Sequence, residues 1–451
     1  MTLFFLSAFA HASAQYSLTL SQAESAALIH SSGLKSQQAL IDAAQSQQLA
    51  ADSLREPKLS VDATYYYQTH VSSKTLGSLG TFTFGDNNNF YLGPNLSYTL
   101  YDGGVLAQNA QAAENLVAAR EMDLKTQTRW LRLQVQLAYF RVQLGLSNLL
   151  LTANALKLAQ AQSSDIDLRY KAGAASRLDQ ISARKNVLAY QLKFTLAQND
   201  LANTLRDLFA LMGEKNTYDT ARVGPAVLAT SLPEGLVPFS LLLDFEPLEK
   251  SLKNFVVLAS PGVLSEHPQI KALQLYADAS KTAATGQQAV SSPKVQVFGK
   301  SQVLYPDGVV QGTAINNVVT LMFTLPVLDG HLQERLTQQK LSEAKTYELQ
   351  ADDKLNALQR DYAKAQDALQ SLKTQQDLNS QMQQQAQEIA QLTYQAYQAG
   401  RVNFLDVENA NLHLLEAKVD AARTTHQMLI QLATLNYLAP STTQKQGDTA
   451  S

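Results

Sequence analysis

The chain has 451 residues, of which 17% are charged, with a formal net charge of −3 and no cysteine. This near balance of charge gives no sign of the basic surface that nucleic-acid binding requires. The lack of cysteine excludes disulfides, thiolate metal sites and a lipid-modified N-terminal cysteine.

The N-terminus has the pattern of a secretory signal peptide. A short apolar run, "LFFLSAFA", is followed by the small residues Ala12 and Ala14 in the spacing of a cleavage site, although the usual basic residues are missing. We expect cleavage after Ala14. No later segment has the run of about 20 apolar residues that a transmembrane helix needs, so we expect any membrane entry to use strands.

Apolar and polar residues alternate in two pairs of segments, and this alternation predicts four strands. The first pair covers residues 59–67 and 90–100, and the second covers residues 295–305 and 315–325. Their length and their aromatic residues are typical of membrane-barrel strands, whereas two ordinary hairpins of a soluble sheet are the alternative. Polar, Gly-rich loops, "SSKTLGSLGTFTFGDNNN" and "PDGVVQGTA", connect each pair. Four strands cannot close a barrel, so the chain would have to share one with other copies.

Long helices are predicted after each strand pair. Proline is absent between Asn95 and Gly224 and between Val327 and Ala439, and both stretches are rich in Ala, Leu, Gln, Lys and Glu. The Gln-rich run 375–398 could instead be disordered, but its apolar spacing favours a helix. Shorter helices are predicted near residues 18–54 and 268–291. Asp102 and Asp329 are expected to cap the starts of the long helices.

Two similar sequence motifs interrupt the long predicted helices. They are "YKAGAASRLD" and "YQAGRVNFLD". Gly173 and Gly400 can end a helix with a positive φ, and Ser176 and Asn403 can cap the next one. Each motif is therefore predicted to be the tip of a helical hairpin.

These features repeat along the chain. Gly173 and Gly400 are 227 residues apart, as are Asp179 and Asp406, whereas Pro57 and Pro293 are 236 apart because the first strand loop is longer. We expect a signal peptide (1–14), a first repeat (15–212), an equatorial connector beside the helices (213–261), a second repeat (262–439) and a disordered tail (440–451).

The duplicated tips, the junctions "SYTLYDGG" and "FTLPVLDG" and the paired strands resemble those of the TolC-type outer-membrane efflux factors over nearly the whole chain. The resemblance implies a mainly α fold with a β-barrel part, closed as a homotrimer in outer-membrane lipid and extending into the periplasm. It implies a passive exit duct of a tripartite efflux or type I secretion system, working with a periplasmic adaptor and an inner-membrane pump.

The resemblance also implies a periplasmic gate at the tips. By position, the gate tyrosine is Tyr397, its aspartate partner is Asp179, and a corresponding carboxylate is Asp406. Two departures from the family pattern occur: Arg401 lies one place early, with Val402 in the family's arginine position, and Asn409 replaces a pore aspartate. Tyr397 could alternatively be a simple packing aromatic. The tip residues that match the adaptor-docking region are Gly173, Ala174, Ser176, Leu178, Gly400, Val402, Asn403 and Leu405.

Two other classes of protein are alternatives. A periplasmic adaptor also has a long helical hairpin, but it should have one tip rather than two. An enzyme, such as a periplasmic hydrolase, would need catalytic chemistry, yet the histidines lack metal-ligand spacing and no phosphate loop or nucleophile elbow is present. We therefore expect no catalytic residues, metal or cofactor.

Overall fold

The structure is a computed structural model that describes residues 16–213, 243–254 and 264–439. The predicted signal peptide, most of the predicted connector and the predicted tail lie outside the described residues. The chain divides into two compact units, which we consider separately. The sheet unit comprises Ser36–Leu124 and Pro268–Lys354, and the helical unit comprises Met1–Lys35, Lys125–His267 and Leu355–Ser451.

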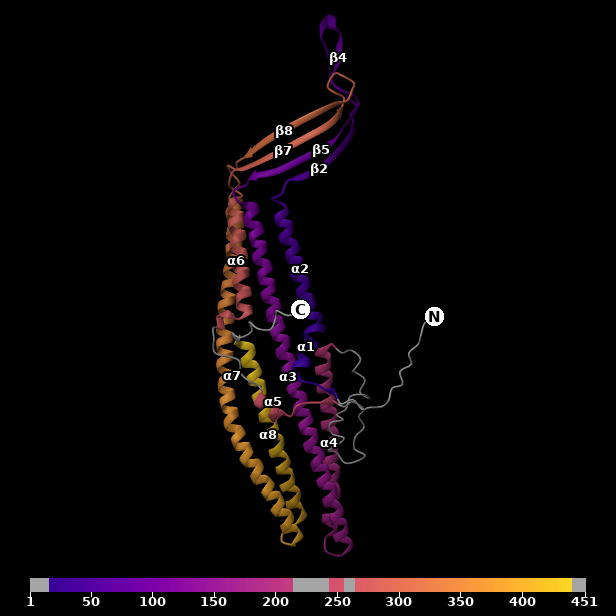
Figure 1. The fold of residues 1–451 in the computed structure, drawn as a ribbon, viewed down its shortest axis with the longest axis vertical. Helices are drawn as coiled ribbons and strands as arrows, with labels where there is room; N and C mark the ends of the chain where they lie inside the picture. The colour runs from indigo at the N-terminus through magenta and orange to yellow at the C-terminus, as the bar shows by residue number, and fades with distance from the viewer. Residues whose placement is uncertain (1–15, 214–242, 255–263, 440–451) are drawn as a thin grey trace, which may run out of the picture. The chain divides into compact units, whose positions relative to one another are not determined.

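The sheet unit contains the four predicted strands. They are β2 (Lys58–Tyr67), β5 (Asn88–Tyr101), β7 (Lys294–Tyr305) and β8 (Ala314–Thr324). They form one antiparallel sheet in the order β2-β5-β7-β8, with the four strands side by side in Figure 1. The pairing of β5 with β7 joins the two repeats, while β2 and β8 are edge strands without a second partner in the described chain.

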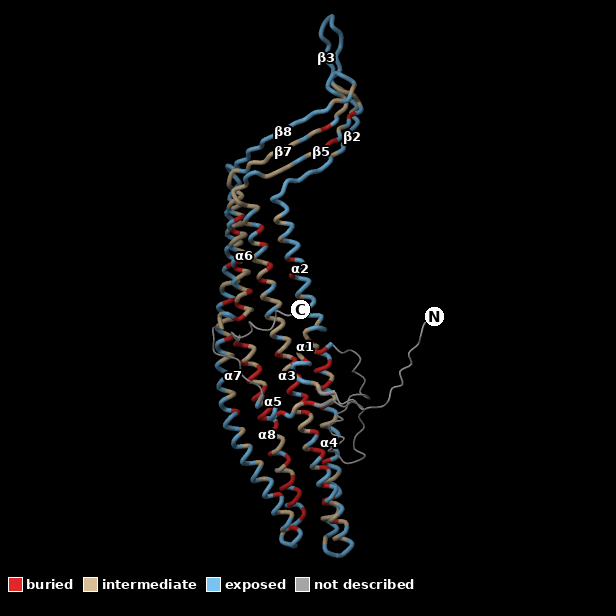
Figure 2. Tube along the Cα trace, in the orientation of Figure 1, coloured by how far each residue is buried: buried red, intermediate tan, exposed pale blue. Residues whose placement is uncertain are grey.

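The two faces of the sheet differ in polarity. Leu59 pairs with Leu96 on one face, and Ser60 pairs with Asn95 on the other. Asn95 Nδ2 also donates a hydrogen bond to Asp62 Oδ2 at 3.2 Å. Leu59 is 73% exposed, and most of the sheet is exposed in Figure 2. Large apolar side chains on an uncovered face fit a sheet that contacts lipid better than one that contacts water.

The first strand loop contains more structure than the sequence predicted. It includes a short hairpin of β3 (Ser73–Thr75) and β4 (Thr81–Thr83), joined by a single 3-10 turn, η1 (Gly77–Leu79). The Thr75 and Thr81 hydroxyls are hydrogen-bonded at 2.8 Å. Period-two alternation over three residues is too short to be recognised in a Gly-rich sequence, which is why a plain loop was expected.

Both sheet-to-helix junctions are capped by aspartate, as predicted. Asp102 accepts hydrogen bonds from the Gly104 and Leu106 backbone N–H groups, each at 2.9 Å. Asp329 accepts equivalent bonds from His331 and Gln333 at 3.0 and 3.1 Å. The long helices α3 (Val105–Lys171) and α7 (Leu332–Gln398) begin here.

Short helices accompany the long ones in the sheet unit. They are α2 (Ser32–Ser53) and α6 (Pro268–Ala289). Tyr276 of α6 donates a hydrogen bond to Asp123 Oδ2 on α3 at 2.6 Å and stacks on Tyr347 of α7 at 5.4 Å. These contacts attach α6 to both long helices, several turns after each of them begins.

The helical unit consists mainly of two antiparallel helical hairpins. One comprises α3 and α4 (Arg177–Met212), and the other comprises α7 and α8 (Phe404–Leu438). These bounds agree with the predicted arms. The unit also contains α1 (Leu20–His30), α5 (Leu248–Asn254), the 3-10 turn η4 (Leu264–Glu266) and a parallel pair of β1 (Tyr16–Ser17) with β6 (Leu243–Asp244).

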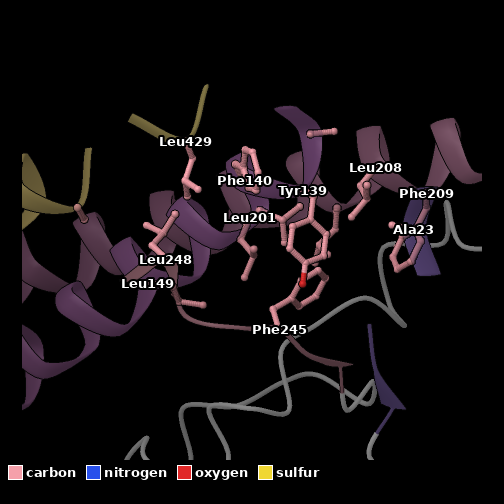
Figure 3. Packing of buried hydrophobic residues seen from close by; sticks show 14 of the residues in the cluster. Ala23, Tyr139, Phe140, Leu149, Leu201, Leu208, Phe209, Phe245, Leu248 and Leu429 are labelled. Carbon is pink, nitrogen blue, oxygen red and sulfur yellow. The ribbon is translucent and has the colours of Figure 1, made fainter. Parts of the chain in front are cut away.

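The main core of the helical unit lies between α1, α3, α4, α5 and α8 (Figure 3). Tyr139 and Phe140 of α3 are fully buried there, and Tyr139 donates a hydrogen bond to the Leu18 carbonyl at 2.8 Å. Phe245 packs on the Tyr139 ring at 5.4 Å. Among the described helices, none combines the length and the apolar character needed to cross a bilayer.

Candidate gate at the paired hairpin tips

Both hairpins turn at the predicted glycines. Gly173 has φ 72° and Gly400 has φ 71°, a region that side chains disfavour. At the first tip the Ala174 N–H bonds to the Arg169 carbonyl at 2.7 Å, and at the second the Arg401 N–H bonds to the Ala396 carbonyl at 2.9 Å. These bonds satisfy the last carbonyls of α3 and α7, so each long helix ends where the sequence predicted.

The return helices start with the predicted caps. Ser176 caps α4 and Asn403 caps α8, each in a reciprocal capping box with an aspartate three residues later. Asp179 Oδ2 accepts bonds from the Ser176 backbone N–H and hydroxyl at 3.1 and 2.8 Å. Asp406 Oδ2 accepts a bond from the Asn403 N–H at 3.2 Å. Both predicted gate carboxylates therefore hold a helix start in the single chain.

A small apolar cluster joins the two tips. It draws on all four helices and consists of Ile166, Ala183, Tyr397, Phe404 and Val407. Tyr397 is 9% exposed, and its ring meets the edge of Phe404 at 5.5 Å. Val402 packs against this tip cluster from the side. The ring of the predicted gate tyrosine is thus part of the packing between the hairpins.

No hydrogen bond joins Tyr397 to Asp179 within the described chain. Burial raises the pKa of the Tyr397 phenol above its usual value, and the nearby negative charge of Asp179 raises this pKa further. The predicted pairing of the two residues stays a prediction for the assembled protein.

A neighbouring tyrosine makes the polar contact between the hairpins. Tyr394 donates a hydrogen bond to Asp165 Oδ2 at 3.0 Å, and Arg169 Nε bonds to the same oxygen at 2.9 Å. Arg169 also reaches the Gln398 carbonyl at 3.5 Å. Burial and the bond to Asp165 raise the pKa of Tyr394. Sequence reasoning missed this group; its signal was the Asp165–Arg169 pair, spaced i,i+4 on one helix face.

Further polar contacts follow deeper in the hairpins. The Asn411 amide on α8 donates to Gln162 Oε1 on α3 at 3.0 Å, and both residues are buried. Glu408 on α8 lies 3.6 Å from Lys185 Nζ on α4. Burial raises the pKa of Glu408 although the lysine opposes the shift, and Glu408 Oε1 has no hydrogen-bond partner among the described residues.

The remaining predicted tip residues are exposed. Arg401 and Asn409 of the predicted gate face solvent in the single chain. So do the other residues predicted to meet an adaptor: Gly173, Ala174, Ser176, Leu178, Gly400, Asn403 and Leu405. Two exposed leucines at the very end of the hairpins, Leu178 and Leu405, give the tips an apolar contact surface.

The groups at the tips can form hydrogen bonds between neighbouring helices that break and form again reversibly. Hydrogen bonds that involve a carboxylate are strong and directional, yet a small helix rotation can break them. In the described part of the chain, no three His, Cys, Asp or Glu side chains gather in a way that could hold a metal ion.

Comparison with known proteins agrees with this fold. The family model described as "Outer membrane efflux protein" matches residues 24–214 and 260–439. The outer membrane protein VceC from Vibrio cholerae is 18% identical, with a TM-score of 0.72, over 93% of this chain and 95% of that chain. A membrane protein from Pseudomonas aeruginosa is 19% identical, with a TM-score of 0.75, over 93% of each chain.

A third solved structure is the outer-membrane channel MtrE from Neisseria gonorrhoeae in its open state. It is 16% identical, with a TM-score of 0.71, over 93% of this chain and 88% of that chain. At such identities the likeness concerns the fold alone. No curated protein matches the chain.

Proposed function

The chain belongs to the outer membrane efflux protein family, and on this premise we propose that three copies form the exit duct of a tripartite efflux or type I secretion system. As a member of this family, the protein is an outer-membrane efflux channel, located in the outer membrane and extending into the periplasm. The proposal adds the trimer, the gate, the periplasmic adaptor and the inner-membrane pump.

The observation that carries the trimer is the open sheet. Both edge strands, β2 and β8, have unpaired outer edges in the described chain. Unpaired backbone groups are not tolerated in lipid, and single-chain barrels begin at about eight strands. Pairing β2 of one copy with β8 of the next would remove every edge. The apolar face would then meet lipid, and the face that carries Ser60, Asp62 and Asn95 would line the channel.

The gate is proposed at the hairpin tips. The tip cluster, the capping carboxylates Asp179 and Asp406, and the exposed Arg401 and Asn409 lie in or next to the two turns. Both hairpins turn at the same end of the helical unit (Figure 1). Tyr397 contributes its ring to closure, and its hydroxyl has no hydrogen-bond partner among the described residues. The periplasmic adaptor, an alternative identity considered from the sequence, has no support, because the family match spans both repeats.

Conductance tests the duct. Protein extracted from the outer membrane should produce discrete conductance steps in planar bilayers, with extract from cells lacking the gene as the control. Recovery of the protein in the soluble periplasmic fraction, without conductance, would contradict the proposal.

The proposed docking of a periplasmic adaptor on the hairpin tips is tested separately. Leu178→Asp together with Leu405→Asp should abolish export in cells while leaving bilayer conductance intact, because the apolar contact surface of the tips becomes charged. Gln370→Asp, at an exposed position of α7 away from the tips, is the matched control. Normal export by the double variant would remove the docking role of these leucines.

A further inference from the structure

All charged side chains of the four long strands lie on one face of the sheet. They are Lys58, Asp62, Lys294 and Lys300. The strand pairing places all four on the face of Ser60 and Asn95, because side chains alternate along a strand. On the opposite face, which carries Leu59, no residue of these strands is charged. This arrangement is expected if the charged face lines a water-filled channel and the other face meets lipid.

Lys300 lies halfway along β7 between neutral neighbours. It is exposed, and the residues that pair with it are Asn95 on β5 and Val318 on β8. Within the described chain it forms no ion pair, and its ammonium lies 5.0 Å from the centre of the Tyr91 ring. Such a contact with an aromatic face orients the ammonium but leaves its positive charge in place.

The one acidic residue of these strands, Asp62, does not pair with Lys300. Asp62 lies on β2, two strands away from β7, which corresponds to about 10 Å across the sheet. Its carboxylate oxygens accept hydrogen bonds from the Ser60 hydroxyl at 3.3 Å and from the Asn95 amide at 3.2 Å. A separation of about 10 Å is close to the Debye length at physiological ionic strength, so salt screens the attraction between the two charges.

The other two lysines lie where the sheet meets the helices. Lys58 and Lys294 begin β2 and β7 and are equivalent in the repeat, 236 residues apart. Both line a groove of about 320 Å³ that Glu56 and Asp102 also line, so two carboxylates balance two lysines at this end of the sheet. The loops at the far end of the strands carry Lys74, Asp86 and Asp307. Positive charge therefore predominates in the middle of the sheet, at Lys300.

Resting on the proposed trimeric barrel, we infer that Lys300 forms a cationic ring at mid-height of the channel, where anionic solutes are favoured over cationic ones. Three copies related by symmetry place three Lys300 ammonium groups at one level. The other side chains of the same row across the sheet, Ser60, Asn95 and Val318, are neutral. Charges of one sign on a wall of low dielectric focus their field in the lumen and raise the local concentration of counter-ions. The solutes that this ring favours are carboxylates, sulfonates and other anions.

Thiol modification measures the local potential directly, because the natural chain has no cysteine. Val318→Cys places one thiol beside Lys300 on the same face. The detergent-extracted full chain is treated with two methanethiosulfonate reagents, one bearing a sulfonate and the other a trimethylammonium group. The ratio of the two rate constants, divided by the same ratio for free mercaptoethanol, cancels the reactivity of the thiol itself. We expect this normalised ratio to favour the anionic reagent roughly tenfold in low salt. In 1 M salt it should approach one, because the Debye length falls to about 3 Å.

Charge variants show whether Lys300 causes the preference. In the Val318→Cys protein, Lys300→Gln should bring the normalised ratio close to one, whereas Lys300→Arg, which keeps the charge, should leave it high. Asp62→Asn removes the one negative charge of the strands and should not lower the ratio. A normalised ratio at or below one before any charge is changed, or a ratio that Lys300→Gln leaves unaltered, would overturn the cationic ring.

Val319→Cys distinguishes failure of the ring from failure of the barrel. Val319 is 81% exposed and lies on the opposite face of β8, so detergent around the barrel should shield its thiol from both charged reagents. Equal modification of Val318→Cys and Val319→Cys, or a Val318→Cys thiol that neither reagent reaches, would refute the barrel and with it the proposed duct. Should Val318→Cys fail to assemble, Thr320→Cys, two residues further along the same face, repeats the measurement.

Discussion

Tyr397 and Tyr394 lie three residues apart at the end of α7 but make different contacts. The Tyr397 ring is packed between four helices, whereas the Tyr394 hydroxyl carries the hydrogen bond between hairpins. Their rings are stacked 6.5 Å apart. Tyr397 therefore stabilises the tips by apolar packing, and Tyr394 links the two hairpins by a directional hydrogen bond.

Substitution separates the ring of Tyr397 from its hydroxyl. Tyr397→Ala should raise the conductance of the closed channel, because loss of the buried ring costs up to about 3 kcal/mol per copy. With three copies the loss could exceed the roughly 5.5 kcal/mol that converts a 1:99 equilibrium into 99:1. Tyr397→Phe should stay near the wild-type conductance, since the hydroxyl has no hydrogen-bond partner among the residues that the structure describes. A rise as large for Tyr397→Phe as for Tyr397→Ala would instead mean that the hydroxyl bonds a carboxylate in the assembly.

Glu408 makes the junction between α4 and α8 sensitive to pH. Burial holds its pKa above the value of 4.5 expected in the unfolded chain. The folded state then binds a proton more readily than the unfolded state, so stability rises as pH falls through the raised pKa and is constant below 4.5. The melting temperature of the wild type should therefore rise between neutral pH and about pH 5. Glu408→Gln should lack this rise, because its side chain does not titrate.

Glu416→Gln is the matched control for this experiment. Glu416 lies two turns further along the same helix, is exposed, and contacts His413 at 3.2 Å. Its variant should keep the wild-type difference in melting temperature between neutral pH and about pH 5. The same flattening in both variants would show that another group causes the pH dependence.

The pairing of β5 with β7 leaves no room for a side chain at Gly93. A Cβ atom at this position would lie 1.9 Å from the Ser301 carbonyl oxygen, so a side chain would force two backbones apart. Gly299, in the same pair of strands, has only ordinary contacts, the nearest at 3.7 Å. Gly93→Ala should therefore lower the melting temperature of the assembled protein strongly, and Gly299→Ala should change it little. Equal melting temperatures would contradict the close approach.

The sequence predicted elements better than it predicted pairings. The strand bounds, the long helices and the glycine turns follow from alternation, from the absence of proline and from the need for a positive φ, all of which are local. The Tyr394–Asp165 contact joins residues more than 200 positions apart, and the repeat does not reveal it because Leu392 occupies the position that corresponds to Asp165. The Asp165–Arg169 spacing marks one side of this contact, but nothing local in the sequence indicates that Tyr394 is the partner on the other side.

The whole molecule is incomplete as a single chain. Its sheet has two open edges, its large apolar strand residues are exposed, and α4 and α7 carry uncovered leucine and isoleucine side chains. Each of these features is satisfied if three copies close around one axis, with the twelve strands in one barrel and the hairpins alternating in one ring. The number of chains in the particle is therefore the central claim about this protein.

Native mass measurement of the detergent-extracted protein tests that claim most directly. The chain has a mass of 49.3 kDa before removal of the expected signal peptide. We expect a single species of three mature chains that persists on dilution, because lipid does not tolerate the open edges of one sheet. A stable species with the mass of one chain, extracted from the membrane and folded, would contradict the account.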